Sequence, residues 1–146
     1  MRQARCEVRT AEVVDAVSIS RLSIELGYPA DRVETIGRLE EIWDRPDHEV
    51  FVAVWSEAVV GWIQIRHSQL IVEDRYAEIV GLVVAGGRRR EGIGRLLVER
   101  AESWAKEHQC STLRLRSNVM RVESHPFYEA CGFNNVRTQA LHVKDL

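Results

Sequence analysis

The sequence has little of the features that mark several specialised classes of protein. Its 146 residues contain no apolar run near the ~20 residues of a membrane-spanning helix, so we expect no membrane span or membrane partner. Twenty basic and 22 acidic side chains give a formal net charge of −2, which argues against a general nucleic-acid binder. The first six residues carry charge but precede no apolar stretch, so they do not predict a secretory signal.

Cysteines and histidines are also too few and too scattered to form a recognisable site. The three cysteines, Cys6, Cys110 and Cys131, predict neither a disulfide framework nor a zinc site, and they fit a reducing cytoplasm. No two histidines are spaced at i, i+4, so we expect no metal. His125 and Cys131 would point to different sides of a helix, which argues against a Cys–His nucleophile. We therefore expect a cytoplasmic protein without a metal centre.

The apolar patterns predict one domain over residues 1–146, because no repeat, low-complexity tract or linker divides the chain. The expected order is β-α-α-β-β-β-α-β-α-β, a mixed sheet with helices packed on it. The predicted strands are residues 6–10, 50–55, 59–65, 75–84 and 113–116, with one or two more over 136–143. The predicted helices are residues 11–26 and 30–43, one that begins at 92, and a short one over 123–130.

A basic, glycine-rich segment lies between a predicted strand and a predicted helix. Residues 86–95 hold four arginines and four glycines. A helix N-terminus has unpaired backbone N–H groups and a partial positive charge, and glycines let an anion approach them closely. Arginines add charge-assisted hydrogen bonds to phosphate. The pattern predicts a diphosphate-binding loop over residues 88–94, and an ordinary basic loop that caps a helix is the alternative.

Two familiar phosphate-binding loops do not match these residues. A P-loop needs Lys-Ser or Lys-Thr after its second glycine, and neither dipeptide follows here. A dinucleotide-binding loop needs Gly-x-Gly-x-x-Gly, and Leu97 stands where the third glycine would be.

The segment resembles the pyrophosphate loop of the GNAT superfamily of acyl-CoA-dependent N-acyltransferases. That loop reads Arg/Gln-x-x-Gly-x-Gly/Ala, and residues 89–94 read Arg-Arg-Glu-Gly-Ile-Gly. Residues 77–84 are similar to the family's fourth strand. Asn118, Phe127-Tyr128 and Gly132-Phe133 are similar to its final signature. One departure is Gly86, where the family often has proline.

The resemblance implies an α/β, single-domain GNAT-type fold, with a mixed, mostly antiparallel, V-opened sheet flanked by four helices. It also implies that acetyl-CoA is the co-substrate. The backbone at the end of the fourth strand would pair with the pantetheine arm, the loop would hold the pyrophosphate, and Asn118 would contact the pantetheine chain. The residues assigned to acetyl-CoA in this way are Leu82, Val83, Val84, Arg89, Arg90, Gly92, Ile93, Gly94 and Asn118.

Two residues are candidates for proton transfer. Tyr128 matches the family's tyrosine near the thioester sulfur, where its O–H would donate to the CoA thiolate as it leaves. Glu78 lies on the strand that leads to the thioester, and its carboxylate would take the proton of the amine, directly or through water. The alternatives are that Tyr128 only packs on the sheet and that Glu78 is solvated or salt-bridged. Alternation along the strand would place Glu78, Val80, Leu82 and Val84 on one face.

The function that the resemblance implies is transfer of an acetyl group from acetyl-CoA to a primary amine by direct attack in a ternary complex. A non-catalytic acyl-CoA-binding regulator on the same fold and an unrelated phosphate-binding module are the alternatives. The acceptor would be a small-molecule or peptide amine, selected mainly by residues 11–49. Exposed strand edges also allow a homodimer.

Overall fold

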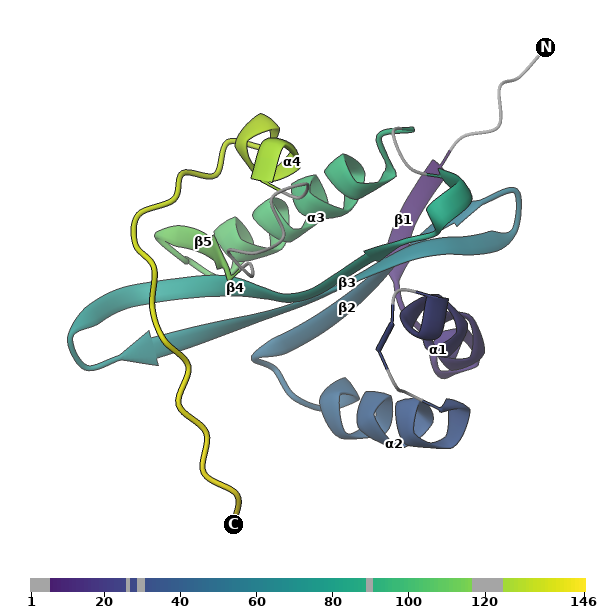
Figure 1. Ribbon diagram of the computed structural model, residues 1–146, viewed down its shortest axis with the longest axis horizontal. Helices are drawn as coiled ribbons and strands as arrows, with labels where there is room; N and C mark the ends of the chain where they lie inside the picture. The colour runs from purple at the N-terminus through teal and green to yellow at the C-terminus, as the bar shows by residue number, and fades with distance from the viewer. Residues whose placement is uncertain (1–5, 26, 29–30, 89–90, 117–124) are drawn as a thin grey trace. The chain divides into compact units, whose positions relative to one another are not determined.

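The computed structural model describes residues 6–25, 27–28, 31–88, 91–116 and 125–146 (Figure 1). The chain divides into two compact units, Met1–Leu115 and Arg116–Leu146. The first unit contains β1 (Cys6–Thr10), α1 (Ala16–Glu25), α2 (Arg32–Trp43), β2 (His48–Trp55), β3 (Ala58–Leu70), β4 (Glu73–Val84), α3 (Ile93–Glu107) and β5 (Thr112–Leu115). Short 3-10 turns cover Val13–Asp15 and Gly86–Arg88. The second unit contains α4 (His125–Ala130).

The five strands of the first unit form one mixed sheet in the order β1-β2-β3-β4-β5. The first three pairings are antiparallel, and β4 pairs with β5 in parallel. The parallel pair is connected through α3, as a crossover between parallel strands requires. The mixed, mostly antiparallel sheet and the four α-helices of the described residues confirm the expected fold class.

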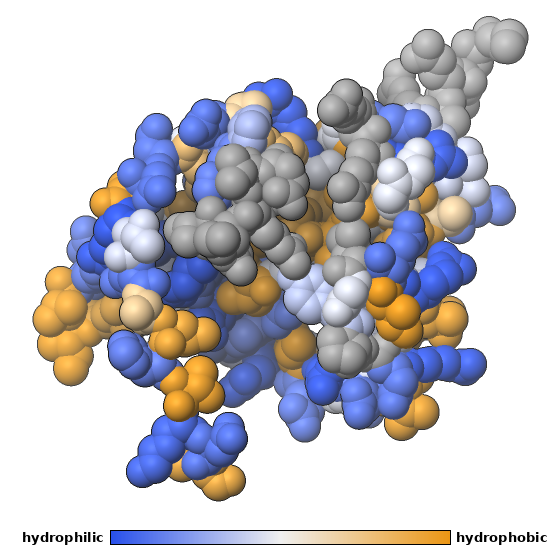
Figure 2. All heavy atoms as spheres, viewed as in Figure 1, coloured by the Kyte–Doolittle hydropathy of each residue, from blue (hydrophilic) through white to orange (hydrophobic). Residues whose placement is uncertain are grey.

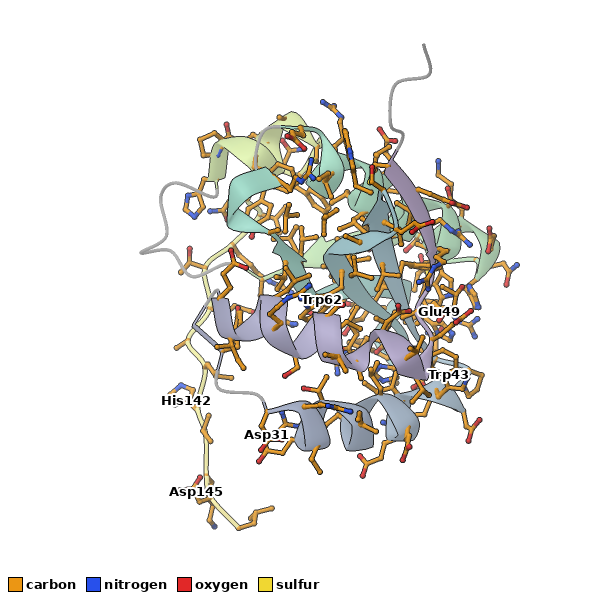
Figure 3. All side chains as sticks on the ribbon, turned by 90° about the vertical axis from the view of Figure 1, so that its right-hand side faces the viewer. Asp31, Trp43, Glu49, Trp62, His142 and Asp145 are labelled. Carbon is orange, nitrogen blue, oxygen red and sulfur yellow. The ribbon has the colours of Figure 1, made fainter. Side chains whose placement is uncertain are left out.

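Helices cover the two faces of this sheet differently (Figure 1). On one face α3 packs closely on β3, where a Cβ added at Gly61 would lie 3.2 Å from Leu97 Cδ1. On the other face α1 and α2 cover a cluster of buried side chains from the sheet and from both helices. Its members are Ala11, Ala16, Ile19, Leu22, Leu39, Val50, Val52, Val59 and Val83. Trp62 packs against this cluster, between the sheet and α1 (Figure 3).

The β3–β4 hairpin extends past its neighbours in the sheet (Figure 1). Its strands are longer than the sequence predicts, because they continue to Leu70 and resume at Glu73. The residues of the tip, Leu70, Ile71 and Val72, are exposed, and Figure 2 shows an apolar group at this end of the molecule. None of the helices in the described ranges is both long and apolar enough to cross a membrane.

A β-bulge at Val80 interrupts β4. Ile79 pairs with Ile65, but Gly81 pairs with Gln64, so Val80 is an extra residue with no partner on β3. Alternation therefore restarts after the bulge, and Glu78 shares a face with Gly81 and Val83. The expectation that Glu78 lies on the same face as Leu82 and Val84 is wrong for this reason.

Two other predicted elements differ from the structure. The helix expected over residues 11–26 is a 3-10 turn followed by α1, which begins only at Ala16. The strand expected over 136–143 does not form, and Val136, Leu141 and Val143 are 87%, 89% and 77% exposed. A strand is stabilised by pairing with another strand, and the described residues of this second unit contain a helix but no strand.

Candidate active site

The end of β4 offers an open backbone edge. β5 is four residues long and pairs with β4 only from Tyr76 to Ile79. From Gly81 to Val84, β4 pairs with β3 on one side, and from Val80 onward no strand of the described residues pairs with it on the other. The sheet is therefore open beside Leu82, Val83 and Val84, as the sequence prediction of a V-opened sheet requires. Backbone groups at such an edge can pair with an extended ligand.

In the chain, the open edge of β4 is followed by a loop and then by α3. The N-cap of α3 is Gly92, with a left-handed φ of +80°, and no side chain caps the helix there. A residue other than glycine is strained at this φ, although a Cβ would meet nothing within 4 Å. The first-turn residues Ile93 and Gly94 follow. The missing side-chain cap leaves the N-terminus of α3 suited to an anion.

Contacts from three directions hold the described part of the preceding loop. Glu25 at the end of α1 accepts a hydrogen bond of 3.2 Å from the backbone N–H of Gly86. The guanidinium of Arg88 lies 5.2 Å from the centroid of the Trp55 ring and 3.5 Å from a carboxylate oxygen of Glu91. Arg89 and Arg90, predicted to bind the pyrophosphate, lie outside the described residues.

Glu78 is buried on the face of the sheet that α1 and α2 cover, with an exposed fraction of 2%. Its Oε1 accepts a hydrogen bond of 2.8 Å from Nη2 of Arg66, its partner on β3. The structure thus contains the salt bridge that the sequence left open as an alternative, while the proton-transfer role stays a prediction. Arg66 was missed from the sequence, because only the register of the β3–β4 hairpin places it beside Glu78.

Tyr128 belongs to the second unit, where it lies in the short helix α4. Its ring makes an edge contact with Phe127 at a centroid distance of 5.7 Å, and its carbonyl accepts a hydrogen bond from the N–H of Phe133. Gly132 follows the helix with a φ of +92°, a left-handed conformation that favours glycine after the C-terminus of a helix. Asn118 lies outside the described residues, and the catalytic role of Tyr128 stays a prediction.

One pocket of the first unit lies apart from all of these residues. Its volume is about 410 Å³, and its lining includes Trp43, Glu49, Arg100 and Trp104. Trp43 and Glu49 lie on the same side of the molecule in Figure 3. None of the residues predicted from the sequence to bind acetyl-CoA or transfer protons lines it.

Comparison with known proteins agrees with this geometry. An uncharacterized N-acetyltransferase of Chlorobaculum tepidum is 35% identical over 137 residues, which cover 94% of this chain and 81% of that protein. Aminoglycoside N(6')-acetyltransferase type 1 of Stenotrophomonas maltophilia is 26% identical over 131 residues, which cover 86% of this chain and 84% of that protein. These names support N-acetyl transfer in general terms.

A solved structure extends the comparison to the fold. An aminoglycoside N-acetyltransferase in complex with CoA is similar with a TM-score of 0.89 at 15% identity, over 99% of this chain and 98% of that chain. The sequence profile described as the Acetyltransferase (GNAT) family matches residues 17–133, which include β4, the glycine-arginine loop and α4. The chain belongs to the GNAT family of acetyltransferases.

Proposed function

We propose that residues 1–146 form one acetyltransferase domain, which moves an acetyl group from acetyl-CoA to a primary amine by direct attack in a ternary complex. The observation that carries the proposal is the open edge of β4, which is followed in the chain by the basic loop and the glycine-capped N-terminus of α3. One element suits an extended, amide-containing chain, and the other suits a diphosphate. Acetyl-CoA has both parts in this order.

Each part of the cofactor has a proposed place in the chain. The backbone of Leu82, Val83 and Val84 pairs with the pantetheine arm as an additional strand would, with Asn118 contacting the same arm. The loop and the first turn of α3 bind the pyrophosphate through charge and backbone N–H groups. The loop residues in this role are Arg89, Arg90, Gly92, Ile93 and Gly94.

The reaction needs an uncharged amine and a protonated leaving group. The nitrogen of the amine attacks the thioester carbonyl carbon, the C–S bond breaks, and an amide and CoA are formed. We propose that the Glu78 carboxylate accepts the proton of the amine. Because Glu78 is buried, transfer through a water molecule is favoured over direct contact. Tyr128 donates its O–H proton to the departing thiolate.

A substitution at Gly92 tests the binding half of the proposal. Gly92→Asp adds a negative charge and a strained φ at the pyrophosphate site, so it should abolish acetyl-CoA binding measured by calorimetry. Gly37→Asp is the matched control, because Gly37 is on α2, has an ordinary φ and has open space around it. Unchanged binding by the Gly92 variant would show that the loop assignment is wrong.

A substitution at Tyr128 tests the catalytic half. Tyr128→Phe removes the proton donor and keeps the ring, so release of CoA with an amine acceptor should slow while acetyl-CoA binding persists. A wild-type chain that binds acetyl-CoA but releases no CoA with any amine would instead favour the non-catalytic regulator.

A further inference from the structure

The sheet face under α1 and α2 has an apolar part and a polar part. Val50, Val52, Trp62 and Val83 belong to the apolar part, packed against the two helices. On the same face, the residues nearer the β3–β4 hairpin tip include the polar Gln64, Arg66 and Glu78, followed by the buried Tyr76. The change of character occurs beside the bulge at Val80, where the open edge of β4 begins.

Four of the polar residues form a row across the sheet. His48 on β2 is paired with Arg66 on β3, Arg66 with Glu78 on β4, and Glu78 with Arg114 on β5. Residues opposite each other on neighbouring strands point to the same face, so the four side chains stand side by side. We call His48, Arg66, Glu78 and Arg114 the polar row.

The charges of the polar row are balanced once Glu73, the partner of Arg114, is counted with it. Arg66 pairs with Glu78, and Arg114 pairs with Glu73 at 2.7 Å. Burial lowers the pKa of His48, with Arg45 and Arg66 acting in the same direction and Asp47 opposing them, so His48 is neutral at pH 7. An electroneutral surface of this kind suits a zwitterion better than a polycation or a dianion.

Arg66 is less completely bonded than the other arginines that form short ion pairs. In the described part of the chain, its side chain makes one hydrogen bond, from Nη2 to Glu78, and its buried Nε has no partner. Arg9, by contrast, donates hydrogen bonds from two nitrogens to the carboxylate of Asp15, at 2.7 and 2.9 Å. Arg114 stacks over the Tyr76 ring at 3.8 Å besides pairing with Glu73.

The position of Arg66 allows the N–H groups of its guanidinium other than the buried Nε to bind a ligand. Its side chain is 43% exposed, while Glu78 beneath it is 3% exposed, so the guanidinium is the accessible member of the pair. Glu78 precedes the bulge by two residues, which is roughly 7 Å along a strand. A group bound to Arg66 is therefore separated by only a few covalent bonds' length from a ligand bound where the open edge of β4 begins.

We propose that Arg66 binds a carboxylate of the amine acceptor, and that the acceptor is an amino acid or a similarly small amine with a carboxylate a few atoms from its nitrogen. This assignment rests on the proposed acetyl transfer, which places the reacting amine at the start of the open β4 edge. The planar guanidinium matches a carboxylate in shape and charge, and Glu78 positions it from below.

An acceptor comparison tests the proposal with the wild-type chain. CoA release is measured with the common amino acids, with their carboxamides, with alkyl diamines and with an amino-sugar phosphate. At least one amino acid should exceed its own carboxamide by roughly ten- to a hundredfold in kcat/KM, as expected for a charge-assisted contact. The preference would run against intrinsic reactivity, because the amine of a carboxamide loses its proton more readily.

Variants at Arg66 locate the effect. Arg66→Gln should raise KM for the preferred amino acid and so remove most of its advantage over its own carboxamide, and Arg66→Lys should give an intermediate KM. The double variant Arg66→Gln/Glu78→Gln removes both charges, and so covers a single variant that fails to fold around a buried carboxylate. Because it also lacks the proposed base, calorimetry of amino acid binding to its CoA-saturated form replaces the turnover assay, and the preferred amino acid should bind it no better than its carboxamide. Arg38→Gln, on the exposed side of α2, is the control.

Two results would overturn the carboxylate site. One is a turnover result, and the other is a binding result that stays informative even if no amine is acetylated. Turnover of diamines or of the amino-sugar phosphate, with carboxylates no better than carboxamides, would assign Arg66 another role. If no amine is acetylated, the proposed reaction fails, and calorimetry of amino acids against the CoA-saturated chain still decides the carboxylate site. Equal binding of amino acids and carboxamides there would reject it.

Discussion

Gly81 lies against the ring of Trp62 on the α1/α2 face, and replacing it tests the β3–β4 register that follows the bulge. A Cβ added at Gly81 would lie 2.6 Å from Cζ3 and 2.7 Å from Cη2 of Trp62. Both distances are shorter than a van der Waals contact, and Trp62 packs against the buried cluster under α1, so the ring cannot move freely. Gly81→Ala should therefore overpack this face.

The cost of this substitution follows from the geometry. Overpacking a dense core costs about 1–3 kcal/mol, which lowers the Tm of a chain of this length by roughly 2–12 °C. Urea denaturation and thermal unfolding of Gly81→Ala measure both quantities. Gly37→Ala is the control, because a Cβ there meets nothing within 4 Å and alanine favours the helix, so its stability should be unchanged or raised.

A second substitution identifies the ring as the cause. Trp62→Leu removes the two ring carbons that the new methyl group meets. In that background Gly81→Ala should cost less than about 1 kcal/mol by the same urea assay, a coupling expected of residues in contact. If Gly81→Ala is harmless in the wild type, or equally costly in the Trp62→Leu background, then Gly81 does not lie against Trp62 and the β3–β4 register that follows the bulge is wrong.

Two further predictions concern the stability of the first unit. Burial acts to raise the pKa of Asp15, but hydrogen bonds from Arg9 and from the N–H of Glu12 outweigh it, so the pKa is lowered overall. The ionised carboxylate therefore stabilises the fold above its unfolded pKa and loses that effect as pH falls through the folded pKa, so Asp15→Asn should flatten the urea stability curve below about pH 4. Leu97→Ala should cost about 2–5 kcal/mol in urea denaturation because Leu97 is fully buried, whereas Leu96→Ala at 38% exposure should cost less than half as much.

Apolar periodicity predicted most of the helices and strands because each pattern is local. The spacing of Ile93, Leu97, Ala101 and Trp104 gave α3 and its buried stripe, and all four are buried. Leu96, which the same spacing includes, is largely exposed because it lies at the margin of the stripe. Residues 136–143 were also predicted to form a strand, yet a strand needs a partner, and that requirement cannot be seen in the segment itself.

The site was predicted less completely, because parts of it depend on pairing between segments. The loop and Glu78 were found from the residues and from the family's motifs. The partner of Glu78 was not, since Arg66 is twelve residues away and reaches it only through the register of the hairpin. Without the bulge, alternation would place Glu78 with Leu82 and Val84, on the opposite face from Arg66.

The bulge at Val80 therefore connects three features of the site. It begins the stretch of β4 that β5 does not cover, it separates the face of Glu78 from that of Leu82, and it is followed at once by Gly81, which lies against Trp62. The open edge is a property of the backbone, while the Arg66–Glu78 pair is a property of one face. Under the proposed function, the extra residue between them lets a single strand present its backbone to acetyl-CoA and its buried charge to the acceptor.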